Sequence, residues 1–218
     1  MIKDHPEELI RTTQRFGKSK EDFLSIRLWD REPGLDKFTL VERAARIIYL
    51  NKTCFNGLFR VNSQGQFNVP FGDYRNPKIV EESIIRAISS YLSRVNIELL
   101  QGDFGVVVEK AKKNDFIYFD PPYDPLSDTS SFTGYSLNSF DQKEQKRLRD
   151  TCDKLSDRGC KVLVSNSATN FIRELYSSNR YTIVDVEANR NINSVGSGRR
   201  KITELLVFSN YEIKNTLG

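Results

Sequence analysis

The stretch Asp115 to Tyr123, DFIYFDPPY, holds the side chains best suited to chemistry. Its apolar residues Phe116 to Phe119 lead directly into Asp120-Pro121-Pro122-Tyr123, so the pattern predicts a buried strand that ends in a loop stiffened by two prolines. Ligands of α/β sheets bind beyond the carboxyl ends of the strands, where this loop would lie. We therefore expect Asp120 and the residues that follow it to form a reactive site.

These groups could activate an exocyclic amine. The N6 nitrogen of adenine is a poor nucleophile because its lone pair is delocalised into the ring. If the Asp120 carboxylate and the Pro121 carbonyl accept its two N–H bonds, tetrahedral geometry is favoured and the lone pair becomes available. The ring of Tyr123 could stack on a base that has been extruded from a duplex. The alternative is a rigid Pro-Pro turn on which Tyr123 packs.

The elements expected around this loop indicate an α/β fold. A helix is predicted from about Asp141 to Ser156. Short apolar runs predict strands at Ile97 to Leu100, Phe116 to Phe119, Lys161 to Ser165, Tyr181 to Val186 and Glu204 to Phe208. This alternation of strands and helices predicts a sheet with at least some parallel pairing.

The residues before this part read as mainly helical. Helical patterns begin at Pro6 and cover Leu40 to Leu50 and Lys78 to Val95. Leu58 to Pro70 alternates polar and apolar residues around Asn62-Ser63-Gln64-Gly65, which predicts a β-hairpin with a short turn. We therefore expect a helical module with a hairpin at residues 1–78 and an α/β part at residues 79–218.

Composition excludes several classes of protein. Three cysteines without CxxC spacing and a single histidine argue against a disulfide framework or a metal site. No apolar run approaches the roughly 20 residues that span a bilayer, and the charged start lacks a secretory signal, so a cytoplasmic protein without a membrane partner is expected. The formal charge of +4 is compatible with a polyanionic partner but is weak evidence for one.

Several separated motifs resemble the α-group of amino-methyltransferases, most closely its Dam/DpnM type, the D12 class. The matching segments are FNGLFRVNSQGQFNVPFGDY (55–74), GDF (102–104), DPPY (120–123), SFTGYSLNSF (131–140), VLVSN (162–166) and RRKITELLVF (199–208). The resemblance implies an incomplete Rossmann-like methyltransferase sheet with a helical target-recognition module that bears the hairpin. It also implies methyl transfer from S-adenosylmethionine to adenine N6 in double-stranded DNA, by base flipping and direct in-line transfer.

The same resemblance assigns residues to the DNA. Arg60 would read a guanine through a bidentate contact in the major groove, and the implied site is GATC. The other residues implied at the DNA are Phe55 and Asn56 near the target adenine, Leu58 and Pro70 at thymine methyl groups, Tyr74 in the same segment, and Arg199 and Arg200 at phosphates. For these last two arginines a solvated surface is an equal alternative. Asp73 departs from the family, since relatives can carry a basic residue there and an acid repels phosphate.

The cofactor residues are also implied by the family. Asp103, followed by Phe104, resembles the acid that contacts the adenine moiety of S-adenosylmethionine, and Asp120 would border the same pocket. A helix cap in solvent is the alternative role for a loop aspartate such as Asp103. Residues 131–140 resemble a segment that closes over the extruded base, although their aromatic side chains could equally be local core.

Relatives begin with a lysine-bearing Gly-Gly segment and a glycine-rich loop after the first strand, and no glycines of this sequence match them. We therefore expect that two strands and half of the cofactor pocket are missing. The alternatives are a truncated, inactive GATC-binding remnant, half of a split enzyme that needs an N-terminal half, or a mis-called start codon. A cognate restriction endonuclease system is a further expected partner.

Other reactions fit the sequence less well. A C5-cytosine methyltransferase needs a cysteine after proline, and all three cysteines here follow Thr or Gly. The hairpin match disfavours N4-cytosine and RNA amino-methyltransferases. A nuclease is poorly supported, because Asp120 has no ExK-type partner and is followed directly by prolines.

Overall fold

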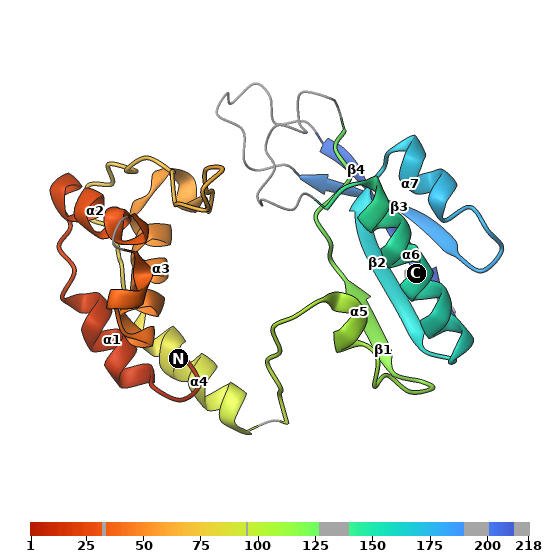
Figure 1. Cartoon of the computed structure of the whole chain (residues 1–218), viewed down its shortest axis with the longest axis horizontal. Helices are drawn as coiled ribbons and strands as arrows, with labels where there is room; N and C mark the ends of the chain where they lie inside the picture. Colours follow the sequence, from red (N-terminus) through yellow and green to blue (C-terminus); the bar gives the residue numbers. More distant parts are fainter. Residues whose placement is uncertain (32–33, 95, 127–139, 190–200, 212–218) are drawn as a thin grey trace, which may run out of the picture. The chain divides into compact units, whose positions relative to one another are not determined.

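A computed structural model describes residues 1–31, 34–94, 96–126, 140–189 and 201–211 of the chain (Figure 1). The chain divides into two compact units, the first formed by Met1–Leu99 and the second by the described residues from Leu100 onward. Each unit has a hydrophobic core of its own, so each is considered separately.

The first unit is helical. Its elements are α1 (Pro6–Gln14), α2 (Lys20–Arg27), α3 (Leu40–Thr53) and α4 (Glu82–Arg94), with single 3-10 turns η1 (Leu28–Asp30), η2 (Leu35–Lys37) and η3 (Phe55–Gly57). Ser19 and Thr39 begin α2 and α3 with capping boxes, in which side chain and backbone exchange hydrogen bonds across the first turn. Helix α1 packs against both α3 and α4.

The predicted hairpin is reduced to a tight turn closed by one antiparallel bridge, Val61 to Phe67. The Gly65 amide donates to the Asn62 carbonyl at 2.9 Å, and Gly65 takes the positive φ of 74° that favours glycine. The amides of Asn62 and Asn68 donate to the carbonyls of Gln66 and Arg60 on either side of this bridge. The backbone groups of Phe67 therefore point away from Val61, and side chains of η1 and its neighbour bind them. Asp30 Oδ2 accepts from the Phe67 amide, and Arg31 donates to the Phe67 carbonyl, both at 2.8 Å.

Helix α4 lies in the first unit, so the division falls near residue 99 rather than at the predicted residue 78. The Ser89 hydroxyl donates to the Lys3 carbonyl at 2.9 Å, and Arg86 pairs with Glu7 at 2.7 Å. These contacts reach from α4 to the start of the chain. Sequence patterns place the helix itself but do not show which neighbour it packs on.

The second unit is a mixed α/β layer. Its elements are α5 (Phe104–Val107), β1 (Phe116–Phe119), α6 (Gln142–Asp157), β2 (Lys161–Ser167), α7 (Asn170–Leu175), β3 (Thr182–Asn189) and β4 (Lys201–Ser209). The strand order is β1-β2-β4-β3, with β1 parallel to β2 and β4 antiparallel to both of its neighbours. The expectation of an α/β fold with some parallel pairing is confirmed.

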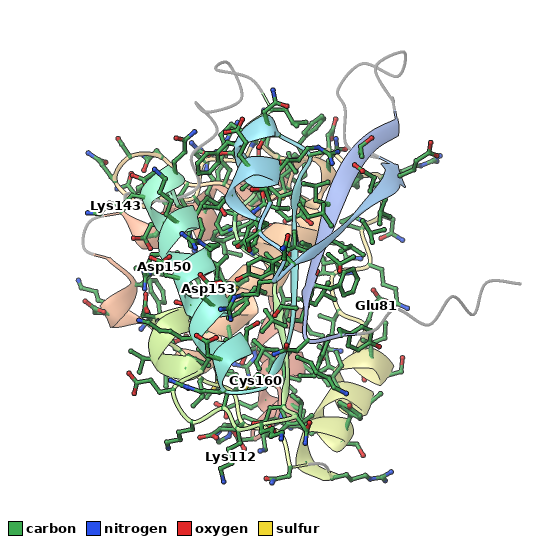
Figure 2. The ribbon with its side chains drawn as sticks, turned by 90° about the vertical axis from the view of Figure 1, so that its right-hand side faces the viewer. Glu81, Lys112, Lys143, Asp150, Asp153 and Cys160 are labelled. Atoms are coloured by element: carbon green, nitrogen blue, oxygen red, sulfur yellow. The ribbon has the colours of Figure 1, made fainter. Side chains whose placement is uncertain are left out.

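The core of this unit lies between the sheet and its helices. Leu148, Cys152 and Leu155 of α6 are buried together with Val162 and Val164 of β2. The opposite side of α6 is charged, and Figure 2 shows Lys143, Asp150 and Asp153 following one another along it. The amphipathic pattern therefore places α6 against the sheet with its polar side outward.

The predicted strand at Ile97 to Leu100 is wrong, since these residues form no regular element. Leu99 and Leu100 are 72% and 59% exposed. A strand needs a hydrogen-bonded neighbour, and in the described ranges β1 pairs only with β2. Within the described residues no helix is long and apolar enough to cross a membrane.

Candidate active site

Asp120 follows β1 directly and lies beside Ser165 of β2. Parallel pairing aligns Phe119 with Val164, so the next residues along the two strands, Asp120 and Ser165, come together. The Ser165 hydroxyl donates to Asp120 Oδ1 at 2.9 Å and accepts a hydrogen bond from the Tyr118 hydroxyl at 3.0 Å. Ser165 is 2% exposed, whereas Asp120 is exposed. A buried hydroxyl therefore fixes one oxygen of the carboxylate, while the Asp120 side chain remains exposed to solvent.

Two buried amides fix the rest of the DPPY loop. Gln145 of α6 donates from Nε2 to the Pro122 carbonyl at 2.9 Å, and Asn166 of β2 donates to Gln145 Oε1 at 3.0 Å. Asn166 Oδ1 in turn accepts from the Asp124 amide at 3.0 Å. Both amide side chains are fully buried, so they are costly to leave unpaired and define the loop conformation.

The Pro121 carbonyl is not used by this network. In the part of the chain that the structure describes, no group donates a hydrogen bond to it, and Pro121 lies on the wall of a pocket. With respect to the described residues, the carbonyl is thus an unused acceptor next to Asp120. The arrangement offers the two neighbouring acceptors that the sequence predicts for an amine.

Tyr123 ends the loop with its ring about one-third exposed. Its hydroxyl donates to Glu204 Oε2 at 3.4 Å, and burial raises the pKa of Tyr123 above its usual value. The phenol therefore remains neutral at physiological pH, and the ring is anchored at its polar end. Such a ring presents an apolar surface on which a base can stack.

A pocket of about 390 Å³ lies at the carboxyl end of β1. It is lined by Gly102, Asp103, Phe104, Tyr118, Phe119, Asp120, Pro121, Pro122, Phe140, Glu144, Arg147 and Leu148. Its volume is in the range of small-molecule sites. The pocket brings the predicted cofactor residues Asp103 and Phe104 together with the predicted reactive carboxylate.

Asp103 has two roles in the structure. It caps α5 by accepting the Gly105 amide at 2.9 Å, and Arg147 of α6 contacts its two oxygens at 2.9 and 2.7 Å. The hydrogen bonds from Arg147 lower the pKa of Asp103, so the carboxylate is ionised at neutral pH. The Arg147 guanidinium also lies 4.0 Å from the Phe104 ring centroid. Asp103 is thus the N-cap of α5, and it lies in the pocket wall.

An ionised acceptor beside an aromatic ring suits a purine, which has an amino donor and a flat face. Asp103 supplies the acceptor, and Phe104 supplies the ring, which also contacts Phe119 and Phe140 edge-on or tilted at 6.2 and 6.0 Å. The residues present thus fit the adenine end of S-adenosylmethionine. In the described ranges no group of three or more His, Cys, Asp or Glu side chains is placed to hold a metal ion.

In the first unit, four of the predicted DNA-contact residues lie together. The Phe55 amide donates to the Pro70 carbonyl, and the Asn56 amide donates to the Tyr74 hydroxyl, both at 2.9 Å. Asn56 adopts a left-handed conformation with φ 53°, and so does Asp73, the residue before Tyr74, with φ 51°. Phe55 and Tyr74 are each 43% exposed. This compact, partly aromatic surface is available to a ligand.

Arg60 lies two residues before the turn 62–65, and its side chain binds Asn68. Its Nε donates to Asn68 Oδ1 at 2.7 Å, and the side chain is exposed. Leu58 is half-buried and packs against the core of the first unit. The predicted residues Arg199 and Arg200, and residues 131–139 of the predicted closing segment, lie outside the described residues.

Sequence reasoning missed Gln145, Arg147 and Ser165 as parts of the site. One signal was present for Gln145, which lies three residues before Leu148 and seven before Cys152, on the apolar face of its helix. A polar residue in that position must find a buried partner. Ser165 lies in the family-like segment VLVSN, but its partner Asp120 is distant in the sequence, and Arg147 carries no local signal.

Comparisons with known proteins show which family the chain belongs to. A family model described as D12 class N6 adenine-specific DNA methyltransferase matches residues 1–192. The chain is 47% identical over 212 residues to a type II methyltransferase of Lactococcus lactis subsp. cremoris, covering 96% of this chain and 74% of that protein. It is 46% identical over 171 residues to a type II methyltransferase of Methanocaldococcus jannaschii, covering 78% of this chain and 58% of that protein.

A DNA adenine methylase of Vibrio cholerae is 35% identical over 211 residues, which cover 94% of this chain and 73% of that protein. The aligned part of the chain thus spans about three quarters of the Lactococcus and Vibrio proteins and less than two thirds of the Methanocaldococcus protein.

Proposed function

The chain belongs to the D12 class of N6 adenine-specific DNA methyltransferases, and on this premise we propose that it methylates adenine N6 within GATC in double-stranded DNA. The observation that carries the proposal is the pocket at the end of β1, in which Asp103 and Phe104 face the same space as Asp120 and Pro121. A purine-binding wall next to two convergent acceptors is the arrangement that methylation of an amino group requires.

Four residues of the pocket wall and Tyr123 of the DPPY loop have distinct roles in this reaction. S-adenosylmethionine supplies the methyl group when bound, and Asp103 and Phe104 would hold its adenine end. Asp120 and the Pro121 carbonyl accept the two N–H bonds of the target adenine, which makes its lone pair available for direct in-line transfer. Tyr123 stacks on the extruded base. The reaction needs no covalent intermediate with the protein.

We assign recognition of the DNA sequence to the first unit, as the target-recognition module. The exposed Arg60, two residues before the turn 62–65, reads a guanine, Phe55 and Asn56 lie near the target adenine, and Pro70 meets a thymine methyl group. Half-buried Leu58 offers only part of its side chain to a thymine methyl group. The second unit then represents the C-terminal part of a Rossmann-like methyltransferase domain.

The proposal is tested by methyl transfer from labelled S-adenosylmethionine to a GATC duplex, with a scrambled duplex as control. We expect transfer that depends on GATC and that Asp120→Ala abolishes. Asp150→Ala is the matched control, because Asp150 is an exposed acid on the outer side of α6 (Figure 2). Retained transfer in Asp120→Ala would remove Asp120 from this role. Binding of GATC without transfer would leave the chain as a DNA-binding protein only.

A further inference from the structure

We propose that Ser165 is a positioning residue that orients the Asp120 carboxylate, with the Tyr118 hydroxyl orienting Ser165 in turn. The inference rests on the proposed function, since it concerns how Asp120 meets its amine. It adds Ser165 of β2 to a site that otherwise consists of the DPPY loop and the pocket wall, and it gives a role to Tyr118 of β1, which lies in that wall.

The geometry of Ser165 is set by the sheet rather than by a loop. Ser165 lies within β2, is 2% exposed, and sits opposite Asp120 through the register of β1 and β2. Its hydroxyl has one proton, which it donates to Asp120 Oδ1 at 2.9 Å. The position of the donor is therefore fixed by the backbone hydrogen bonds of the strand.

Tyr118 determines which way the Ser165 proton points. A serine hydroxyl can rotate, but Tyr118 donates to the Ser165 oxygen at 3.0 Å and occupies its acceptor side. The Ser165 proton is then left for Asp120. This chain of two hydroxyl groups fixes Oδ1, and among the described residues no group donates to Oδ2, which can accept an N–H of the target amine.

The neutral donor distinguishes Asp120 from Asp103, another carboxylate of the pocket. Asp103 is paired with the guanidinium of Arg147, which compensates its charge. Ser165 instead restrains Asp120 without adding a positive charge that would weaken it as an acceptor. A buried serine on a strand could also serve only to satisfy its own hydrogen bonds, so the test must separate orientation of Asp120 from packing.

The test compares Ser165→Ala, Ser165→Thr and Tyr118→Phe. The first readout needs no activity and is the ¹³C resonance of the Asp120 carboxyl group, assigned with Asp120→Asn. We expect Ser165→Ala and Tyr118→Phe to move this resonance and Ser165→Thr to restore it. The control is Ser209→Ala, because Ser209 is also 2% exposed on a strand but pairs with Ser156. An unmoved resonance in Ser165→Ala overturns the proposal.

The second readout is single-turnover methyl transfer with a GATC duplex. We expect Ser165→Ala to slow transfer roughly 10- to 100-fold, as misplaced catalytic groups do, with unchanged dissociation constants for DNA and S-adenosylmethionine. Ser165→Thr should recover most of the rate. A Thr variant as slow as the Ala variant, or an Ala variant as fast as wild type, contradicts the proposal. If the wild-type chain transfers no methyl group, the proposed function fails, and the resonance still decides the role of Ser165.

Discussion

Asp103 and Asp120, two of the three carboxylates in the pocket wall, have different hydrogen-bond donors, and Arg147 is the donor to Asp103. It contacts both oxygens of Asp103, pairs with Glu144 at 2.6 Å and covers the Phe104 ring. Its side chain is 41% exposed, so these ion pairs add little to the stability of the fold. Its effect should instead appear in ligand binding, because it holds both groups that would contact a purine.

We therefore predict that Arg147→Gln weakens binding of S-adenosylhomocysteine about tenfold, or about 1.4 kcal/mol, as measured by calorimetry. The variant should also change the pH dependence of binding. Because Arg147 lowers the pKa of Asp103, wild-type affinity falls only as the pH drops below the usual range of an aspartate. In Arg147→Gln the pKa of Asp103 rises toward its usual value. As the pH is lowered, the affinity of this variant therefore begins to fall at a higher pH than that of wild type.

The control for this prediction is Arg149→Gln. Arg149 lies on the same helix with a similar exposure of 37%, and it pairs with Asp150 and Asp153 away from the pocket. Equal affinities for both variants and wild type would show that Arg147 does not organise the purine wall.

Some residues of the site could be predicted from the sequence, and others could not. The DPPY loop was predicted because its chemistry and its strand are adjacent in the chain. Ser165 contacts Asp120 across 45 positions, and Arg147 contacts Asp103 across 44. Contacts of this kind depend on strand order and on which helix covers the sheet, and neither follows from local patterns.

At the scale of elements, the buried pair of Asp30 and Arg46 ties the turn-bearing segment to the helices. Arg46 Nη2 lies 2.7 Å from Asp30 Oδ2, and the two side chains are 3% and 9% exposed. Arg46 also donates to the carbonyl groups of Ile26 and Arg27 at the end of α2. Because Asp30 accepts the Phe67 amide as well, the pair connects α2, α3 and the segment that carries Arg60.

We predict that Asp30→Asn lowers the free energy of unfolding of the first unit by about 3 kcal/mol, because it leaves a buried guanidinium without its counter-charge. Urea denaturation followed by Trp29 fluorescence measures this loss. Hydrogen exchange should accelerate at residues 61–69 more than in the second unit. Asp36→Asn is the control, since Asp36 is exposed in η2. A loss as small as that of the control would mean that the pair is not needed to hold the turn.

Sequence patterns predicted the elements with strong periodicity and missed those that depend on neighbours. The helix expected from about Asp141 to Ser156 is α6, and the strand at Phe116 to Phe119 is β1. Ile97 to Leu100 is also mostly apolar but forms no strand, because apolar character alone does not provide a hydrogen-bonding partner. The predicted hairpin is short, and Asp30 and Arg31 bind the outward-facing backbone groups of Phe67, a contact that no local pattern shows.

At the scale of the whole molecule, one edge of the sheet has consequences for how the chain behaves in solution. In the described ranges β1 pairs only with β2, and its side chains Phe116 and Tyr118 are 56% and 52% exposed. An open edge that carries large aromatic side chains can pair with a strand of another molecule. Other exposed apolar residues, such as Tyr91 at 62% on α4, lack this unpaired backbone.

We predict that the 218-residue chain self-associates as its concentration rises, and that Phe116→Lys suppresses this because a charge at an edge strand opposes pairing. Analytical ultracentrifugation over a concentration series measures the association. Tyr91→Lys removes a comparably exposed ring and adds the same charge on a helix, so it should leave association unchanged. If Tyr91→Lys suppresses association equally, general hydrophobicity or net charge is responsible rather than the strand edge. If the wild-type chain remains monomeric throughout, the β1 edge is protected in solution and is not an interaction surface.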